Sequence, residues 1–157
     1  KISPKELTKR MDRFKQGLRQ AGAKLTHQRL EVFRELAKSL DHPDAEAIYR
    51  AVRKRVPTIS LDTVYRTLWL LLDLGLITTL GPSRERTRFD ANLQSHHHFV
   101  CTVCGMTLDF YSKKLDSLKV PVSVKSFGQV RRTNVEVRGL CFACASKKRT
   151  KLMTKSK

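Results

Sequence analysis

The sequence is poor in acidic residues and has no long apolar run. Only 14 of its 157 residues are Asp or Glu, against 32 Lys and Arg, so the formal net charge is +18. The longest apolar run, Leu68 to Leu72, is far too short to cross a bilayer, which argues against a membrane protein. The first residues lack the apolar core of a signal peptide, so we expect a cytoplasmic protein. Length and composition predict one globular domain or two small ones.

The excess of positive charge indicates a polyanionic partner. A net charge of +18 on 157 residues opposes compact folding through self-repulsion unless bound anions relieve it. Residues 1–20 and the tail after Ser146 are the most basic segments, and the tail has no acidic residue. Nucleic acid is the favoured partner and an anionic membrane surface the weaker alternative. A solvated chain end accounts for the basic tail equally well.

The first half of the chain has a helical pattern of apolar residues. The pattern predicts a helix ending before Gly22, and further helices over 27–40, 45–54 and 61–74. Thr26, Asp44 and Ser60 can cap the last three of these helices. Residues 76–80 and 87–89 flank a Gly-Pro-Ser turn and predict a β-hairpin, the wing of a winged helix. The basic residues of the hairpin, Arg84, Arg86 and Arg88, fit phosphate contacts and a solvated loop equally well.

Beyond Asn92 the pattern changes to short strands and short helices. Strands are expected over 99–102, 107–111, 122–130 and 134–140, and helices over 112–118 and 142–149. These residues form a module of about sixty residues, which is too small to be stable without a staple.

All four cysteines lie in this second module, as Cys101-x-x-Cys104 and Cys141-x-x-Cys144. Two such pairs with no cysteine left over are typical of a tetrahedral zinc site. Two disulfides or free thiols are the alternatives, and a cytoplasmic location disfavours the disulfides. A zinc ion held by four cysteines has no open position, so the site would be structural.

Three of the five histidines are adjacent, just before the first cysteine pair. In an extended segment His96 and His98 face one way and His97 the other, which makes His96 and His98 half of a metal site. Asp90 and Asp109 are nearby carboxylates that can complete it. The alternatives are ordinary surface histidines and, for Asp109, a salt bridge to one of the many basic residues.

Several motifs together resemble the ferric uptake regulator (Fur) family. They are Leu-Asp-His-Pro-Asp-Ala-Glu-Ala-Ile-Tyr at 40–49, Ser-Leu-Asp-Thr-Val-Tyr-Arg-Thr-Leu at 60–68, Arg-Phe-Asp at 88–90, the histidines and first cysteine pair at 96–105, and Gly-Leu-Cys-x-x-Cys at 139–144. The resemblance extends over residues 17–148 and is greatest to the peroxide-sensing (PerR) branch. It implies a regulatory Fe(II) or Mn(II) ion on His42, Asp90, His96, His98 and Asp109. Asp109 is informative because the iron-responsive branch usually has Glu there.

The sequence also departs from the family pattern. Residues 130–136 lack the histidines that form another metal site in many members, so we expect that site to be absent. His97 extends the run of histidines and leaves a nickel-responsive protein as an alternative.

The predicted fold class is α+β. We expect an N-terminal winged-helix DNA-binding domain, residues 1–91, and a small α/β dimerisation and metal-binding domain, residues 92–157, with the four-cysteine zinc site. The resemblance implies a homodimeric, metal-dependent repressor that binds a palindromic operator and releases it when peroxide oxidises its histidine ligands. The main alternative is an iron, manganese, zinc or nickel uptake regulator of the same family without peroxide sensing. A zinc enzyme acting on nucleic acid is disfavoured because no open three-ligand site with an adjacent Glu is visible, so we expect no enzyme activity.

DNA contacts are expected at the start of the helix over 61–74. Ser60, Thr63, Tyr65 and Arg66 lie there, and the resemblance implies that Tyr65 and Arg66 contact bases or phosphates in the major groove. Lys24 matches a family lysine that reaches the minor groove. Partial burial against the hairpin is the alternative for Tyr65.

Overall fold

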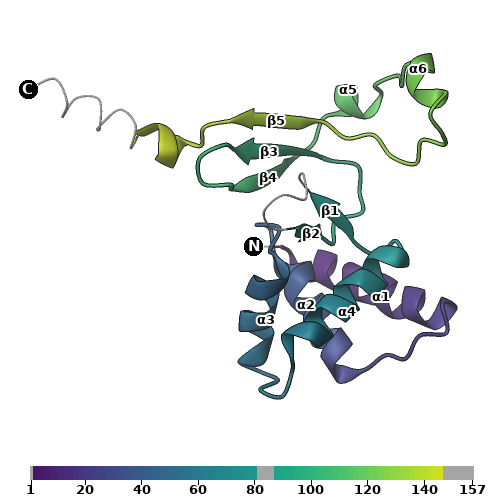
Figure 1. Cartoon of the computed structure of the whole chain (residues 1–157), viewed down its shortest axis with the longest axis vertical. Helices are drawn as coiled ribbons and strands as arrows, with labels where there is room; N and C mark the ends of the chain where they lie inside the picture. The colour runs from purple at the N-terminus through teal and green to yellow at the C-terminus, as the bar shows by residue number, and fades with distance from the viewer. Residues whose placement is uncertain (1, 81–86, 147–157) are drawn as a thin grey trace, which may run out of the picture. The chain divides into compact units, whose positions relative to one another are not determined.

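A computed structural model describes residues 2–80 and 87–146. The chain divides into two compact units, Lys1–Leu93 and Gln94–Lys157, where the sequence placed the boundary after residue 91. Helices dominate the first unit and a β-sheet the second (Figure 1), which confirms the α+β class. Within the described ranges, no helix has the length and apolar character needed to cross a membrane.

The first unit contains the predicted helices and hairpin. Its described elements are α1 (Pro4–Gln20), α2 (His27–Lys38), α3 (Ala45–Arg53), α4 (Leu61–Asp73), β1 (Thr78–Leu80) and β2 (Arg88–Asp90). The two strands are antiparallel, with Thr78 opposite Asp90. Residues 81–86, including Arg84 and Arg86, lie outside the described residues. The predicted role of those two arginines therefore stays a prediction.

Side-chain caps fix where the helices begin. Thr26, Asp44 and Ser60 each accept a hydrogen bond from the backbone N–H three residues later, at the start of α2, α3 and α4. Each such cap stabilises a helix by about 1 kcal/mol. The three predicted caps are confirmed, and the start of α4 is thereby fixed relative to its buried face.

One apolar core holds the first unit together. The rings of Phe14 from α1 and Phe33 from α2 stack with centroids 4.4 Å apart. Val64, Leu68 and Leu71 turn the inner face of α4 into this core and are fully buried. Their spacing of three and four residues leaves the opposite face of α4 in solvent.

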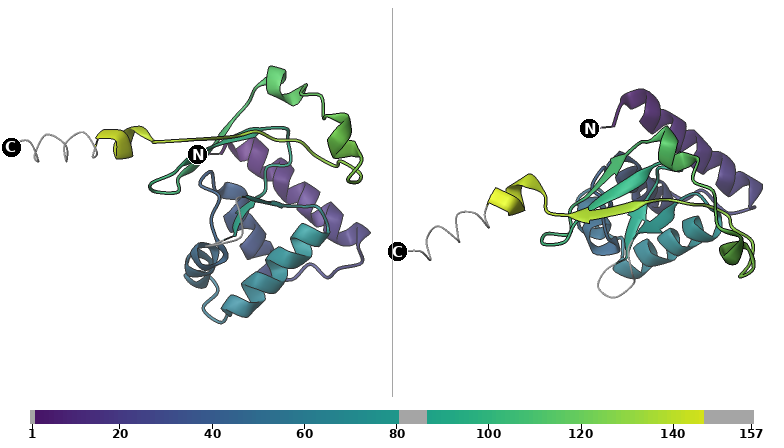
Figure 2. Two further views of the ribbon diagram at one scale, coloured as in Figure 1. Left: turned by 45° about the horizontal axis from the view of Figure 1, so that its top comes forward. Right: turned by 90° about the horizontal axis from the view of Figure 1, so that it is seen from above.

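The second unit is built on a sheet in the order β4-β3-β5 (Figure 2). Its described elements are β3 (His97–Cys101), β4 (Thr107–Phe110), α5 (Lys113–Asp116), α6 (Val122–Lys125) and β5 (Glu136–Gly139). β3 pairs with β4 in antiparallel and with β5 in parallel orientation, and His98 lies opposite Asp109. This register brings a histidine and a carboxylate together on neighbouring strands.

The predicted strand over 122–130 is wrong. Val122–Lys125 forms the short helix α6, and the residues from 126 to 130 form no strand. Pro121 precedes α6 with φ −57°, and its missing backbone N–H opposes pairing in a sheet at this point. The valines raised the strand propensity of this segment, but propensity has little effect without a neighbouring strand to pair with. The last predicted helix is helical over 142–146, and its remainder lies beyond the described residues.

The second unit buries unusual side chains. Its described residues with less than a tenth of their surface exposed are His96, His97, His98, Cys101, Thr107 and Cys141, and none of them is aliphatic. In contrast, Phe142 is 95% exposed and Phe127 is 85% exposed. A module of this size without an aliphatic core needs other sources of stability, such as metal ions or a partner.

Candidate metal centres and the predicted DNA-contacting residues

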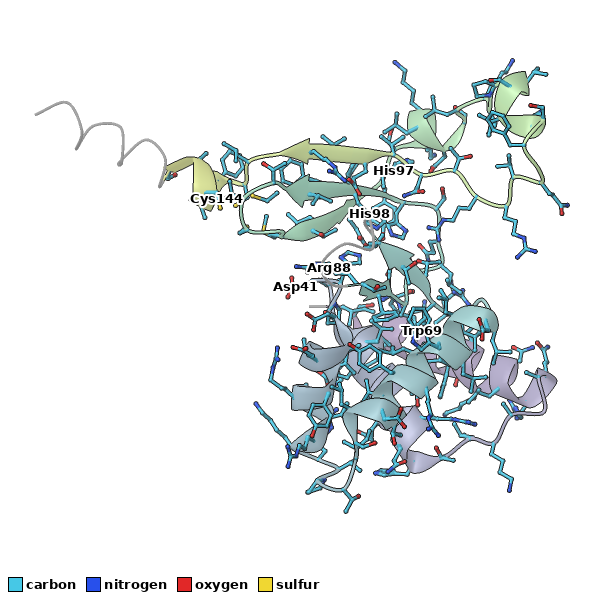
Figure 3. All side chains as sticks on the ribbon, in the orientation of Figure 1. Asp41, Trp69, Arg88, His97, His98 and Cys144 are labelled. Carbon is cyan, nitrogen blue, oxygen red and sulfur yellow. The ribbon has the colours of Figure 1, made fainter. Side chains whose placement is uncertain are left out.

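The four cysteines converge on one point. The Sγ atoms of Cys101, Cys104, Cys141 and Cys144 all lie within 4.8 Å of one another. Cys104 and Cys141 are 3.8 Å apart, and four sulfurs about 2.3 Å from a tetrahedral zinc are about 3.8 Å apart. That separation is far longer than the ~2 Å of a disulfide bond. The cluster therefore fits zinc, and Figure 3 shows its sulfur atoms beside Cys144.

The backbone around the cluster favours a thiolate at Cys101. N–H groups of Cys104, Cys141 and Val103 point at its Sγ atom and lower the pKa of the thiol to about 6. Hydrogen bonds to Cys141 and Cys104 raise the pKa of Cys144 to about 12. A divalent zinc ion removes the protons from all its thiol ligands, so binding releases protons and depends on pH.

A second cluster joins β3 and β4. The Nε2 atoms of His96 and His98 lie 2.9 Å apart. Oδ1 of Asp109 lies 3.7 Å from Nε2 of His96 and 3.5 Å from Nε2 of His98. Nitrogens about 2.1 Å from a shared ion, at right angles to each other, are about 3 Å apart. Two imidazoles and one carboxylate on one side of an ion are a typical Fe(II) site with open positions.

His96 is oriented by the loop before β3. Its Nδ1 atom lies 2.7 Å from the carbonyl oxygen of Gln94. A carbonyl can only accept a hydrogen bond, so the Gln94 contact favours hydrogen on Nδ1 and a lone pair on Nε2. Nη2 of Arg132 also lies 3.3 Å from this Nδ1 atom, and a guanidinium favours the opposite tautomer. The guanidinium of Arg132 also donates to Gln94 O, at 3.1 Å. Arg132 and Gln94 were missed at the sequence level, because a contact between residues 38 positions apart leaves no mark in the local pattern.

His97 faces the other side of β3, as the alternation predicts. The backbone N–H of Val135 donates to its Nδ1 atom at 3.2 Å. Its Nε2 atom lies 3.3 Å from Oδ1 of Asp116, which also accepts a hydrogen bond from Ser95. His97 thus accepts a hydrogen bond from the segment before β5 and lies close to Asp116 at the end of α5. Figure 3 labels it next to His98 on the strand.

His42 and Asp90 come together in the first unit. Nε2 of His42 lies 3.9 Å from Oδ1 of Asp90, and both residues are buried. His42 has φ +48°, a left-handed conformation that costs a non-glycine residue about 1 kcal/mol. The backbone N–H of Asn92 donates to the Asp90 carboxylate at 2.7 Å. Such local strain is typical of functional positions.

Arg88 holds the loop of His42 in place. Its Nη1 atom donates to the carbonyl oxygens of Asp41, at 3.2 Å, and His42, at 3.3 Å (Figure 3). The backbone N–H of Phe89 donates to the carbonyl of Pro43. Arg88 is therefore not a solvated loop residue, because it lies in β2 and is hydrogen-bonded to the backbone. Its predicted phosphate contact stays a prediction. This arginine positions a candidate metal ligand.

The residues predicted to contact DNA lie at three places in the first unit: the exposed face of α4, the start of α4 and the α1–α2 connection. Tyr65 and Arg66 lie on the exposed face of α4, with the Arg66 side chain 81% exposed. Ser60 and Thr63 are joined to each other through their hydroxyl groups and cap the helix. Lys24 is exposed in the α1–α2 connection, and its carbonyl accepts a hydrogen bond from Arg29.

A helical unit with a wing-type hairpin, followed by a sheet with two groups of metal-ligand side chains, defines a metal-binding protein of the winged-helix type. The model of the ferric uptake regulator family matches residues 20–138, and the chain belongs to this family.

Characterised relatives agree with this assignment. The chain is 34% identical over 127 residues to the peroxide-responsive repressor PerR of Staphylococcus epidermidis, covering 81% of this chain and 85% of that protein. Among solved structures, the ferric uptake regulator of Helicobacter pylori has a TM-score of 0.71 at 25% identity, with 88% and 93% of the two chains covered. The peroxide stress regulator of Campylobacter jejuni has a TM-score of 0.62 at 28% identity, with 83% and 95% covered.

Proposed function

We propose that this protein is a metal-dependent transcriptional repressor that releases DNA when peroxide oxidises its histidine ligands. The convergence of His96, His98 and Asp109 carries the proposal. These donors suit Fe(II) or Mn(II), whereas the four-cysteine cluster suits zinc. The similarity to a peroxide-responsive repressor supports the same function. A repressor acts where the DNA is, so the proposal places this protein in the cytoplasm.

The regulatory ion takes further ligands from the first unit in this proposal. His42 and Asp90 form a buried imidazole–carboxylate pair there, and the family resemblance matches both to ligand positions. One ion bound by His42, Asp90, His96, His98 and Asp109 would link the two units. Metal binding would then fix the orientation of α4, so that affinity for metal and affinity for DNA rise together.

DNA binding falls to α4 and the basic surface of the first unit. Tyr65 and Arg66 would contact the major groove, and Lys24 the minor groove, while Ser60 and Thr63 set the start of α4. The exposed apolar residues of the second unit, such as Phe127 and Phe142, support association of two copies. A homodimer presents two copies of α4 and therefore fits a palindromic operator.

The peroxide response uses the imidazole ligands. A ferrous ion bound there would supply the one-electron chemistry that cleaves hydrogen peroxide and would regain its electron from the ring, so that the imidazole is the net two-electron donor. His42 and His96 would each gain one oxygen atom on the ring, with one peroxide consumed and one water released for each. The carboxylates of Asp90 and Asp109 resist this oxidation. An oxidised imidazole is a poor ligand, so the two units would separate and DNA would dissociate.

The test measures binding to DNA selected from a random library with Mn(II)-loaded protein. The Fe(II) and Mn(II) forms should both retain this DNA, and a brief peroxide exposure should release only the Fe(II) form. If metal promotes DNA binding but peroxide has no effect on the Fe(II) form, the protein is a metal uptake regulator instead. If neither metal changes affinity, the metal-dependent repressor is excluded.

A further inference from the structure

An acidic residue lies on the DNA-facing side of α4. Oδ2 of Asp62 accepts a hydrogen bond from Nε of Arg66, at 2.9 Å, and the two side chains are 66% and 81% exposed. Ion pairs this exposed contribute little to stability. A carboxylate on this face also repels phosphate groups. Neither the weak stabilisation from this ion pair nor general affinity for DNA accounts for the pairing of Asp62 with Arg66.

The geometry of the pair leaves the outer end of Arg66 available. An arginine has three donor nitrogens, and Asp62 occupies Nε, the one nearest the helix. Nη1 and Nη2 then form a fork that points along the side chain. This fork matches O6 and N7 of guanine, the commonest specific contact in the major groove. A free arginine instead samples many rotamers and binds phosphate groups as readily as bases.

We propose that Asp62 is a positioning residue that directs Arg66 to one guanine of each operator half-site. The inference rests on the proposed DNA-binding function and adds the base that α4 reads. Asp62 holds the guanidinium plane, and Arg66 makes a bidentate contact with guanine. The same carboxylate opposes the transfer of Arg66 to a neighbouring phosphate. Specificity thus comes from a repulsive element as well as an attractive one.

A purely structural role for Asp62 predicts something different. Asp62 lies in the first turn of α4, where a negative charge interacts favourably with the helix dipole. Loss of that interaction would lower thermal stability and weaken binding to every DNA sequence equally. Loss of the positioning role would change the preference for one base pair and leave the others unaffected.

The experiment uses full-length, Mn(II)-loaded protein and a random DNA library. Wild type, Asp62→Ala and Asp62→Asn are compared, since asparagine can still accept a hydrogen bond from Arg66. Glu46→Ala is the matched control, because Glu46 is the acidic partner of another exposed i,i+4 pair, with Arg50 on α3 at 3.6 Å. The enriched DNA is then tested with 7-deazaguanine at each guanine, which removes only the N7 acceptor.

We expect Asp62→Ala to lose about tenfold of its discrimination at one guanine position per half-site, the value of one bidentate contact. Asp62→Asn should retain part of it, and Glu46→Ala all of it. The 7-deazaguanine at that position should weaken wild type about tenfold and Asp62→Ala much less. Unchanged discrimination in Asp62→Ala, or equal weakening at all positions, overturns the inference. Failure of wild type to enrich any sequence would instead contradict the proposed function itself.

Discussion

The Nε2 atoms of His96 and His98 lie 2.9 Å apart on one side of β3, while His97 between them faces Asp116 on the other side. Strand alternation separates the three adjacent histidines into a ligand pair and a residue that joins α5 to the sheet. Their substitutions should therefore have different effects.

His96→Ala and His98→Ala should lose the regulatory metal, whereas His97→Ala should keep most of it. Each of the first two removes a nitrogen from the cluster with Asp109. His97→Ala removes the acceptor of the Val135 N–H and the neighbour of Asp116, so thermal stability should fall. Mn(II) titration and thermal unfolding measure the two effects. Equal loss of Mn(II) in all three variants would indicate a different ligand arrangement.

Arg132 should support metal binding without being a ligand. It shares the carbonyl of Gln94 with His96, and partners that orient a ligand typically change metal affinity 10- to 100-fold. Arg132→Met should weaken Mn(II) binding by about tenfold. Arg131→Met, which changes the neighbouring arginine, is the control for lost charge. Equal affinities for Mn(II) in these two variants would contradict a specific role for Arg132.

Removal of one zinc ligand should destabilise the second unit. Its described buried residues include Cys101 and Cys141 and no aliphatic side chain, so zinc bound to the cysteine cluster would take the place of an apolar core. Cys101→Ser should lose zinc, and with it dimerisation or the fold of this unit. Zinc content, sedimentation and circular dichroism report the outcome. A stable dimer of Cys101→Ser that still binds DNA would refute a structural zinc.

A buried carboxylate stabilises the first unit. Glu31 is 3% exposed and accepts hydrogen bonds from Nε of Arg55, at 2.7 Å, and from Nη1 of Arg34, at 2.5 Å. Glu31→Gln removes the charge and should lower the free energy of unfolding by about 1–3 kcal/mol. Glu46→Gln, in an exposed pair, should change it by less than about 0.5 kcal/mol. Equal effects in denaturant unfolding would contradict this difference.

The contribution of Glu31 should depend on pH. Burial alone would raise the pKa of Glu31, but the hydrogen bond from Arg55 and the charges of Arg34 and Arg55 hold this pKa below its ordinary value of 4.5. A lowered folded-state pKa stabilises the fold above the ordinary pKa, and this stabilisation is lost as pH falls through the folded-state value. The stability difference between wild type and Glu31→Gln should be constant near neutral pH and shrink below pH 4.5.

The sequence predicted the first unit better than the second. Helix caps such as Thr26 and Asp44 are local signals, and apolar spacing reports the buried face of α4 directly. In the second unit, Val122–Lys125 had strand propensity but no partner strand, so tertiary context decided its structure.

The candidate sites likewise combine features that are visible in the local sequence with contacts that only the folded structure creates. The two cysteine pairs have spacings that are visible locally, and their convergence follows from pairing of β3 with β5. The hydrogen bonds of Arg88 to Asp41 and His42, and of Arg132 to Gln94, join residues about 40 positions apart. Such contacts depend on the finished fold, and a single sequence carries no periodic or motif signal for them.

The most direct test of the peroxide-sensing repressor is mass spectrometry of protein recovered from DNA. Fe(II)- and Mn(II)-loaded protein on the selected DNA is exposed briefly to hydrogen peroxide, and the bound and released fractions are digested separately. The released Fe(II) fraction should carry one added oxygen on peptides containing His42 or His96. The bound fraction and the Mn(II) form should carry none. Release of the Fe(II) form without oxygen on either histidine, or only with loss of zinc from the cysteines, would contradict the proposal.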